Sequence, residues 1–201
     1  MAEMGVCYLL RQLAVMVTAV GLTIPTQQPI PKIEVNQIEE TGETELEVEL
    51  NVENLIQYEV HEIPAYPGKK SYMPHDIFKK GSAQYRLQQA AITDVNGLQV
   101  VDGRYCVAVG TRFKASIGQY IDLVLSNGIV IPCVVGDIKS AKDTDSTNTF
   151  SSNGCCSEFV VNMTKLNKTA KTRGDVSYLN VLWSSPVKQI IVYQNWRDVE
   201  I

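Results

Sequence analysis

The sequence has no excess of basic charge. Among 201 residues, 18 Lys and Arg residues stand against 22 Asp and Glu residues, and the formal net charge is −4. Binding to nucleic acid usually depends on a basic surface, so a nucleic-acid partner is excluded. The sequence also lacks a glycine-rich phosphate loop, a dinucleotide-binding fingerprint and an internal repeat. Nucleotide-binding folds and solenoids are therefore not expected.

Residues for metal binding or for a catalytic triad are also scarce. Five cysteines occur without a Cys-x-x-Cys pair, and the two histidines, His61 and His75, lie in an irregular part of the chain. A zinc site needs closely spaced thiolate or imidazole ligands. A triad needs a histidine and, in one common form, a serine on a sharp strand-to-helix turn. The sequence therefore predicts neither, and no metal or organic cofactor is expected.

The cysteines leave two alternatives open. Cys106 and Cys133 fall in apolar runs, whereas Cys155 and Cys156 are adjacent in a polar segment. The first two are either reduced core residues or, in an exported chain, disulfide partners of the adjacent pair. Cys7 stands apart in the N-terminal apolar stretch, and the odd total leaves one thiol over.

What the sequence does contain is the pattern of a β protein. Hydrophobic residues make up 45% of the chain, and Val, Ile, Thr and Tyr are separated by clusters of Gly, Asn, Asp and Ser. Turn signals separate the apolar runs at 94–97, 102–103 and 126–128. A polar segment at 164–177 has room for a short helix. Short strands at this spacing predict a small closed barrel of about six strands over roughly residues 85–195.

Residues 1–24 are expected to be a signal-like or membrane-anchor segment. An apolar stretch runs from Leu13 to Ile24 and follows Arg11. About 20 apolar residues are needed to span a bilayer, and Arg11 interrupts the longer run. Export or anchoring would place the protein in the cell envelope. A buried N-terminal helix is the alternative.

Residues 25–80 are expected to form an irregular linker rich in Pro and Glu, which leaves 81–201 as the globular domain. Six glutamates fall between positions 39 and 49, and a run of like charges repels itself and stays extended. The stretch 44–52, "TELEVELNV", also alternates as a strand does. Such a strand would add to the globular part or to a partner.

Two carboxylates are the candidates for chemistry. Asp137 directly follows the buried-strand residues Val134, Val135 and Gly136, so its side chain is expected at the barrel rim, where partial desolvation favours a protonated acid. Glu158 begins the next strand and is expected to face Asp137 across the rim. A protonated acid is what cleavage of a glycosidic bond requires. The alternative is that Asp137 caps a turn and Glu158 is solvated.

The order of the motifs "YCVAVG", "IVIPCVVGD" and "SEFVV" resembles the three-aspartate (3D) domain, a six-stranded double-psi β-barrel related to the barrel of membrane-bound lytic transglycosylase A. The likeness extends to proteins of bacteriophages and mobile elements of Firmicutes. Gly110 stands where the family has its first aspartate, Asp137 matches the second, and Glu158 replaces the third. Asp122, in "IDL", belongs to an earlier strand and is not assigned the third role.

The resemblance implies an enzyme that cleaves the glycan strands of peptidoglycan. Asp137 would protonate the glycosidic oxygen and then, as carboxylate, take the proton from the sugar's 6-hydroxyl. Glu158 would orient the substrate or favour the protonated form of Asp137 through its like charge. Polar residues after Asp137 would bind the sugar: Asp143, Thr144, Asp145 and Asn148. The alternative is a non-catalytic barrel that binds glycan or serves a phage or mobile-element assembly.

Overall fold

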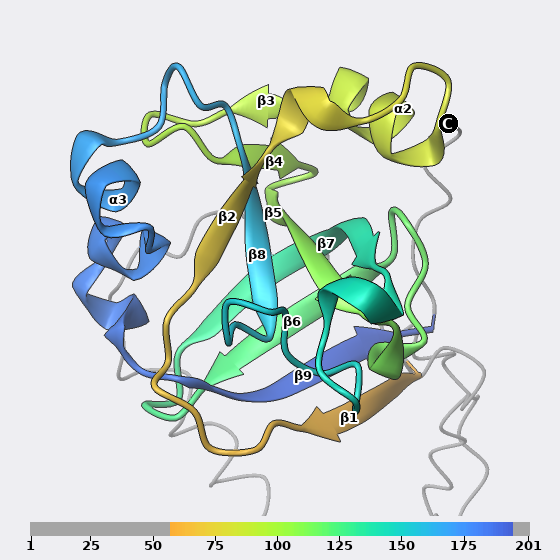
Figure 1. Ribbon diagram of the computed structural model, residues 1–201, viewed down its shortest axis with the longest axis vertical. Coiled ribbons are helices and arrows are strands. Elements are labelled where there is room, and N and C mark those ends of the chain that lie inside the picture. Colours follow the sequence, from red (N-terminus) through yellow and green to blue (C-terminus); the bar gives the residue numbers. More distant parts are fainter. Residues whose placement is uncertain (1–56, 195–201) are drawn as a thin grey trace, which may run out of the picture. The chain divides into compact units, whose positions relative to one another are not determined.

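The computed structural model describes residues 57–194, which form a mainly β fold with few helices (Figure 1). Nine strands in this part of the chain belong to one mixed sheet. The strands are β1 (Tyr58–Glu62), β2 (Ser71–Pro74), β3 (Ile92–Thr93), β4 (Gln99–Val101), β5 (Arg104–Gly110), β6 (Tyr120–Leu125), β7 (Val130–Lys139), β8 (Ser157–Val161) and β9 (Val187–Tyr193). The α-helices are α2 (Ala83–Ala90) and α3 (Lys168–Arg173), and short 3-10 turns include η5 (Val176–Leu179) and η6 (Val181–Ser184).

The sheet follows the order β1-β9-β6-β7-β5-β4-β3, and β8 branches from it by pairing with β5 on one side and β2 on the other. Two of these pairs, β5–β7 and β2–β8, are parallel. The mainly β prediction is confirmed. The sheet is not closed into a barrel, and it has more strands than the six expected.

The predicted turns are present. Asp102 and Gly103 both have positive φ, 50° and 73°, and join the antiparallel strands β4 and β5, as a two-residue hairpin turn requires. Gly128, with φ 85°, joins β6 to β7, and its amide donates to the carbonyl of Leu125. The Asp94 carboxylate accepts from two amides of the turn between β3 and β4. The short helix expected within 164–177 is α3.

Two strands and one helix lie where the sequence indicated otherwise. β1 and β2 fall inside the predicted linker, yet β1 pairs with β9 over five residues and β2 pairs with β8 over four. Each of these two strands pairs with a strand that lies about 90–130 positions later in the chain. Local sequence patterns do not reveal such long-range pairing, so the two strands were not predicted. Helix α2 occupies a run that reads as the beginning of the barrel pattern. The predicted N-terminal helix, the anchor segment and the acidic part of the linker lie outside the described residues.

Helix α2 has a local start signal. The Ser82 hydroxyl accepts from the amide of Tyr85, which is the N-cap bond that begins many helices. Leu87 is fully buried beneath the helix and joins a small core cluster with Val134, Val160 and Ala108. This cluster fixes α2 against the ends of β5, β7 and β8.

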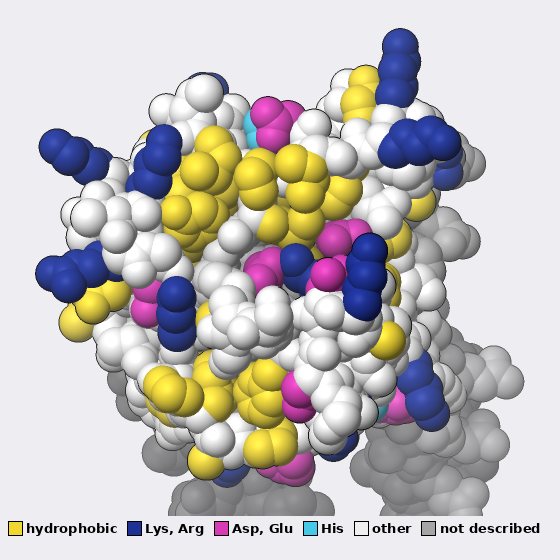
Figure 2. Space-filling view, viewed as in Figure 1, with side chains coloured by type: hydrophobic (Ala, Val, Ile, Leu, Met, Phe, Trp, Pro, Cys, Tyr) yellow, Lys and Arg dark blue, Asp and Glu magenta, His cyan; other side chains and the backbone are white. Residues whose placement is uncertain are grey.

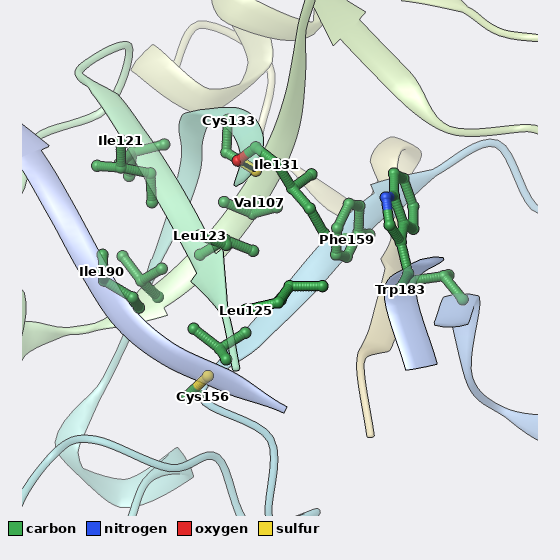
Figure 3. Packing of buried hydrophobic residues seen from close by; sticks show 14 of the residues in the cluster. Val107, Ile121, Leu123, Leu125, Ile131, Cys133, Cys156, Phe159, Trp183 and Ile190 are labelled. Atoms are coloured by element: carbon green, nitrogen blue, oxygen red, sulfur yellow. Dashed lines mark hydrogen bonds between the residues drawn. The ribbon is translucent and has the colours of Figure 1, made fainter. Parts of the chain in front are cut away.

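The larger core lies between the strands of the curved sheet. Figure 3 shows side chains of β6, β8 and β9 pointing toward one another, among them Leu123, Phe159 and Ile190, all fully buried. Burying each such side chain contributes about 1.5–3 kcal/mol relative to leaving it exposed. Trp183 of η6 stacks on Phe159 with ring centroids 5.5 Å apart. The same core supports β5 and β8, the strands that carry the candidate site.

Lys70, just before β2, is fully buried. Its ammonium donates to the backbone carbonyls of Gly68, Trp183 and Ser185 at 3.1, 2.7 and 2.8 Å. Burial lowers the pKa of Lys70, and the nearby Asp175 carboxylate partly opposes that effect. Lys70 therefore ties the start of β2 to the segment before β9.

Among residues 57–194, no helix has both the length and the apolar character that crossing a membrane requires.

Candidate functional site

Four neighbouring strands place a row of residues side by side. Ala108 of β5 pairs with Asp137 of β7 on one side and with Glu158 of β8 on the other, and Glu158 pairs in turn with Ser71 of β2. The row Ser71, Glu158, Ala108, Asp137 therefore crosses β2, β8, β5 and β7. Ala108 is the residue of the row that stands between the two acids, and its side chain is a single methyl group, so it leaves the space between them largely open. The sequence predicted Asp137 after the end of a strand, at a barrel rim, but in the structure Asp137 lies within β7, in one row with Glu158.

A bulge adjusts the position of Asp137. The β5–β7 register shifts between Val107 and Ala108, so that Gly136 is the extra residue of β7. A Cβ on Gly136 would lie 3.1 Å from a Val160 methyl and 3.3 Å from the Cys106 Cβ, tighter than ordinary packing. Glycine lets the bulge lie flat against the core and sets Asp137 in register with Ala108.

Glu158 is buried and fully partnered. Its Oε2 forms an ion pair with the Lys139 ammonium, and its Oε1 accepts from the Asn153 amide at 2.6 Å. The same amide nitrogen lies 2.9 Å from the Ser71 hydroxyl oxygen and donates to it. Only 8% of the Glu158 side chain is exposed. Because the Lys139 cation offsets the charge of Glu158, Glu158 is a structural anchor here.

Asp137 differs from Glu158 in both exposure and partners. It is half-buried, and its Oδ1 accepts from the Gln84 side-chain amide at 3.1 Å. Figure 2 shows acidic and basic side chains together at the centre of one face, between two apolar areas, over the region where Figure 1 places β8 and the end of β7. Asp137 is thus the carboxylate of the row that has a neutral donor and access to solvent.

The first acidic position of the resemblance is closed by backbone. A Cβ on Gly110 would lie 1.9 Å from the carbonyl oxygen of Asn148, far inside any van der Waals contact. No side chain fits there while the loop after β7 keeps this course. The site therefore has two acids, and one of them is neutralised.

The loop after β7 uses its polar groups on itself. Asp145 accepts from the amides of Thr149 and Phe150 and from the Thr147 hydroxyl. Desolvation acts to raise the pKa of Asp145, but the hydrogen bonds from Thr147, Phe150 and Thr149 outweigh it and lower that pKa. These bonds hold the loop in one shape, as Asx turns do.

The other predicted sugar-binding residues share this pattern. Asp143 accepts from the Ser140 hydroxyl at 2.6 Å, and the Thr144 hydroxyl donates to the Asn148 side chain at 2.9 Å. Asn148 itself has φ 55°, a left-handed conformation that asparagine tolerates. Asp143 and Asp145 remain exposed. The loop is therefore held by its own hydrogen bonds, and its two exposed carboxylates face solvent.

Asp122 belongs to a separate cluster. Its carboxylate binds the Arg104 guanidinium at 2.7 Å and accepts from the Tyr193 hydroxyl at 2.6 Å. Arg104 also lies over the rings of Tyr120 and Tyr193, 4.7 and 5.7 Å from their centroids. A charge held in this way joins β5, β6 and β9.

The four cysteines of the described region are free and buried. Burial raises the pKa of Cys106 to about 12 and that of Cys156 to about 11, in both cases against a smaller opposing hydrogen bond. Such thiols are core residues and poor nucleophiles. No group of three His, Cys, Asp or Glu side chains in the described region is arranged to hold a metal ion.

Sequence reasoning missed four residues of the site: Lys139, Asn153, Ser71 and Gln84. Lys139 was within reach of a local argument, because strand alternation puts residues 137 and 139 on one face. Asn153, Ser71 and Gln84 come from a loop, an unpredicted strand and an unpredicted helix, so no local signal placed them.

The partners of the two acids limit the chemistry. A double-displacement glycosidase needs a second carboxylate that is free to act as nucleophile. The Glu158 carboxylate is held by Lys139 and Asn153, so this pair does not suit that reaction. The arrangement suits one carboxyl that gives and takes back a proton.

Comparison of the chain with models of protein families, with curated proteins and with solved structures found no match in any of the three.

Proposed function

We propose that this chain cleaves peptidoglycan glycan strands by a lytic transglycosylase-like reaction in which Asp137 is the only acid and base. The observation that carries the proposal is the contrast within the row. The Glu158 carboxylate is ion-paired with Lys139 and hydrogen-bonded to Asn153, whereas the Asp137 carboxylate accepts from the neutral Gln84 amide and is partly exposed to solvent. A reaction that needs a single carboxyl fits this contrast better than one that needs two.

The reaction balances through Asp137 alone. The protonated carboxyl gives its proton to the glycosidic oxygen while the bond from that oxygen to the anomeric carbon breaks. The carboxylate then takes the proton of the sugar's own 6-hydroxyl as that oxygen bonds to the anomeric carbon. An anhydro ring forms, no water is consumed, and Asp137 is protonated again. Glu158 holds Lys139 and Asn153 in place, and no metal or organic cofactor takes part.

The finer fold assignment is part of the proposal. Strands β2, β5, β6, β7, β8 and β9, which do not close into a barrel here, would correspond to the six strands of a double-psi barrel of the three-aspartate type, with β1, β3 and β4 as additions at the edges. Support comes from the two parallel pairs, β5–β7 and β2–β8, which sit among antiparallel neighbours. Residues 1–24, as a signal or anchor, would bring the domain to the cell envelope.

The test uses the full chain and intact peptidoglycan sacculi. Released muropeptides are analysed by mass for the anhydro product, which is one water lighter than a hydrolysis product. Asp137→Asn is expected to lower the release rate by about 10²–10⁴-fold, the range typical of a lost acid–base group. Asp76→Asn, on an exposed aspartate outside the row, is the matched control and should keep the rate. Release by Asp137→Asn at the full rate would refute the proposal.

A second function is favoured by Gly110. The backbone contact with Asn148 leaves no room for the first acid of the resemblance, and the Lys139 ion pair removes Glu158 from chemistry. The lack of a first acid and the ion-paired Glu158 suit a non-catalytic barrel. Such a barrel would bind glycan without cleaving it, or would serve a phage or mobile-element assembly. Retention of the wild-type chain on sacculi without released product would favour this second function.

A further inference from the structure

We propose that Gln84 is a positioning residue that decides which oxygen of Asp137 carries the transferred proton. The role of that proton in cleavage rests on the proposed function above. The hydrogen bond itself does not, and it joins two elements that are 53 positions apart in the chain. Neither the sequence motifs nor the resemblance assign a role to Gln84.

The hydrogen bond between Gln84 and Asp137 has one chemically sensible direction, in which Gln84 is the donor. An ionised carboxylate has only acceptor oxygens, so the side-chain nitrogen of Gln84, and not its oxygen, must face Asp137. The distance from Gln84 Nε2 to Asp137 Oδ1 is 3.1 Å. Among residues 57–194, no hydrogen bond to Asp137 Oδ2 is found. The two oxygens of Asp137 are therefore not equivalent.

This inequivalence selects the site of protonation. A neutral carboxyl has one carbonyl oxygen and one hydroxyl oxygen, and the N–H of Gln84 favours the carbonyl oxygen, which is the better acceptor, at Oδ1. When Asp137 takes up a proton, the favoured position of that proton is therefore Oδ2. In the proposed reaction Oδ2 gives its proton to the glycosidic oxygen and receives the one from the 6-hydroxyl, while Gln84 keeps its bond to Oδ1 throughout.

The donor stands on a well-anchored element. Gln84 is in the first turn of α2, which begins with the Ser82 cap and is held by the fully buried Leu87. Asp137 is held by its strand pairing with Ala108. A donor and an acceptor that are each fixed by packing retain their geometry with little loss of entropy on substrate binding. Helix α2 thereby acts as a support for the carboxyl.

The experiment measures Asp137 directly. The full chain is labelled with ¹³C, and the side-chain carboxyl carbon of Asp137, assigned with Asp137→Asn, is followed by NMR from pH 2.5 to 8, a range set by ordinary carboxyl behaviour. Three variants are compared with the wild type: Gln84→Leu, Gln84→Lys and Gln89→Leu. Gln89 is exposed on the same helix, so its substitution controls for changes in α2. Amide spectra establish that each variant is folded.

The expected shifts have opposite signs. Gln84→Leu removes a donor that stabilises the carboxylate, so the titration midpoint should rise by about 0.5–1 pH unit. Gln84→Lys keeps a donor and adds a positive charge, so the midpoint should fall. Gln89→Leu should leave it unchanged. Equal midpoints for the wild type and both Gln84 variants would overturn the inference, because a purely structural glutamine would behave in that way.

The two proposals can fail separately. If sacculi release product and Gln84→Leu matches Gln89→Leu in both rate and titration, the function stands and the role of Gln84 is refuted. If the titration shifts as expected while the wild type releases nothing, Gln84 orients Asp137 and the cleavage reaction is refuted. If both hold, Gln84→Leu should lower kcat and leave KM nearly unchanged, because it alters the acid and not the contacts with the sugar.

Discussion

The carbonyl oxygen of Asn148 lies where a side chain on Gly110 would begin, since a Cβ there would stand 1.9 Å away. Gly110 has φ −72° at the end of β5, so its backbone would accept any residue. The contact with the loop, and not the backbone angle, therefore requires glycine. No side chain, acidic or otherwise, fits at this position while the loop keeps its course.

Gly110→Ala should consequently destabilise the protein by about 1–3 kcal/mol, the usual cost of forcing extra atoms into a packed site. Urea unfolding followed by tryptophan fluorescence measures this change in the free energy of unfolding. Ser146→Ala, in the exposed part of the same loop, serves as the control and should change stability by less than about 0.5 kcal/mol. An unchanged midpoint for Gly110→Ala would mean that the loop lies elsewhere.

The ion pair between Glu158 and Lys139 should matter more for stability than for chemistry. Glu158→Gln or Lys139→Met leaves one charge buried without its partner, which is expected to cost about 3–5 kcal/mol. The double variant should lose less than the sum of the two single losses, because no unpaired charge remains. Thermal or urea unfolding of all four proteins measures the coupling. Additive losses would show that the two side chains act independently.

Lys70→Met should lower the free energy of unfolding by at least about 2 kcal/mol, because three backbone carbonyls, two of them in buried contacts, lose their shared donor. Lys69→Met is a close control: the neighbouring lysine is exposed, and its change is expected to stay within about 0.5 kcal/mol. Urea unfolding at pH 7 compares the two. Equal effects would contradict the assigned role of the Lys70 ammonium.

The buried Cys106 thiol predicts a loss of stability in alkali. Its folded-state pKa, about 12, is above the ordinary value of 9.0, so the unfolded chain gives up this proton first. The stabilising contribution is complete below about pH 9 and is lost progressively between pH 9 and 12. Under reducing conditions, Cys106→Ala should therefore show a smaller fall in Tm from pH 8 to pH 10.5 than the wild type. Parallel curves would contradict the prediction.

Local signals in the sequence were sufficient for the mainly β class and for the turns. The Asp102-Gly103 hairpin and the turn at Gly128 follow from residues that accept positive φ, and this preference does not depend on the rest of the fold. The place of Asp137 directly after the buried run 133–136 was also visible locally, although β7 continues through Asp137 to Lys139. The burial of Cys106 and Cys133 agrees with the core alternative that the sequence left open.

Only the tertiary structure decided what each carboxylate does. Asp137 and Glu158 are similar in sequence terms, since each adjoins an apolar run, but Lys139 and Asn153 bind the Glu158 carboxylate. Within residues 57–194, the one hydrogen-bond partner of the Asp137 carboxylate is Gln84. These partners come from a strand, a loop and a helix that pack together only when the sheet forms. The ionisation and reach of a carboxyl group depend on such neighbours, whereas turn and strand preferences depend on a few adjacent residues. Local sequence therefore determined the β pattern, whereas the different environments of Asp137 and Glu158 were determined by the packing of distant segments.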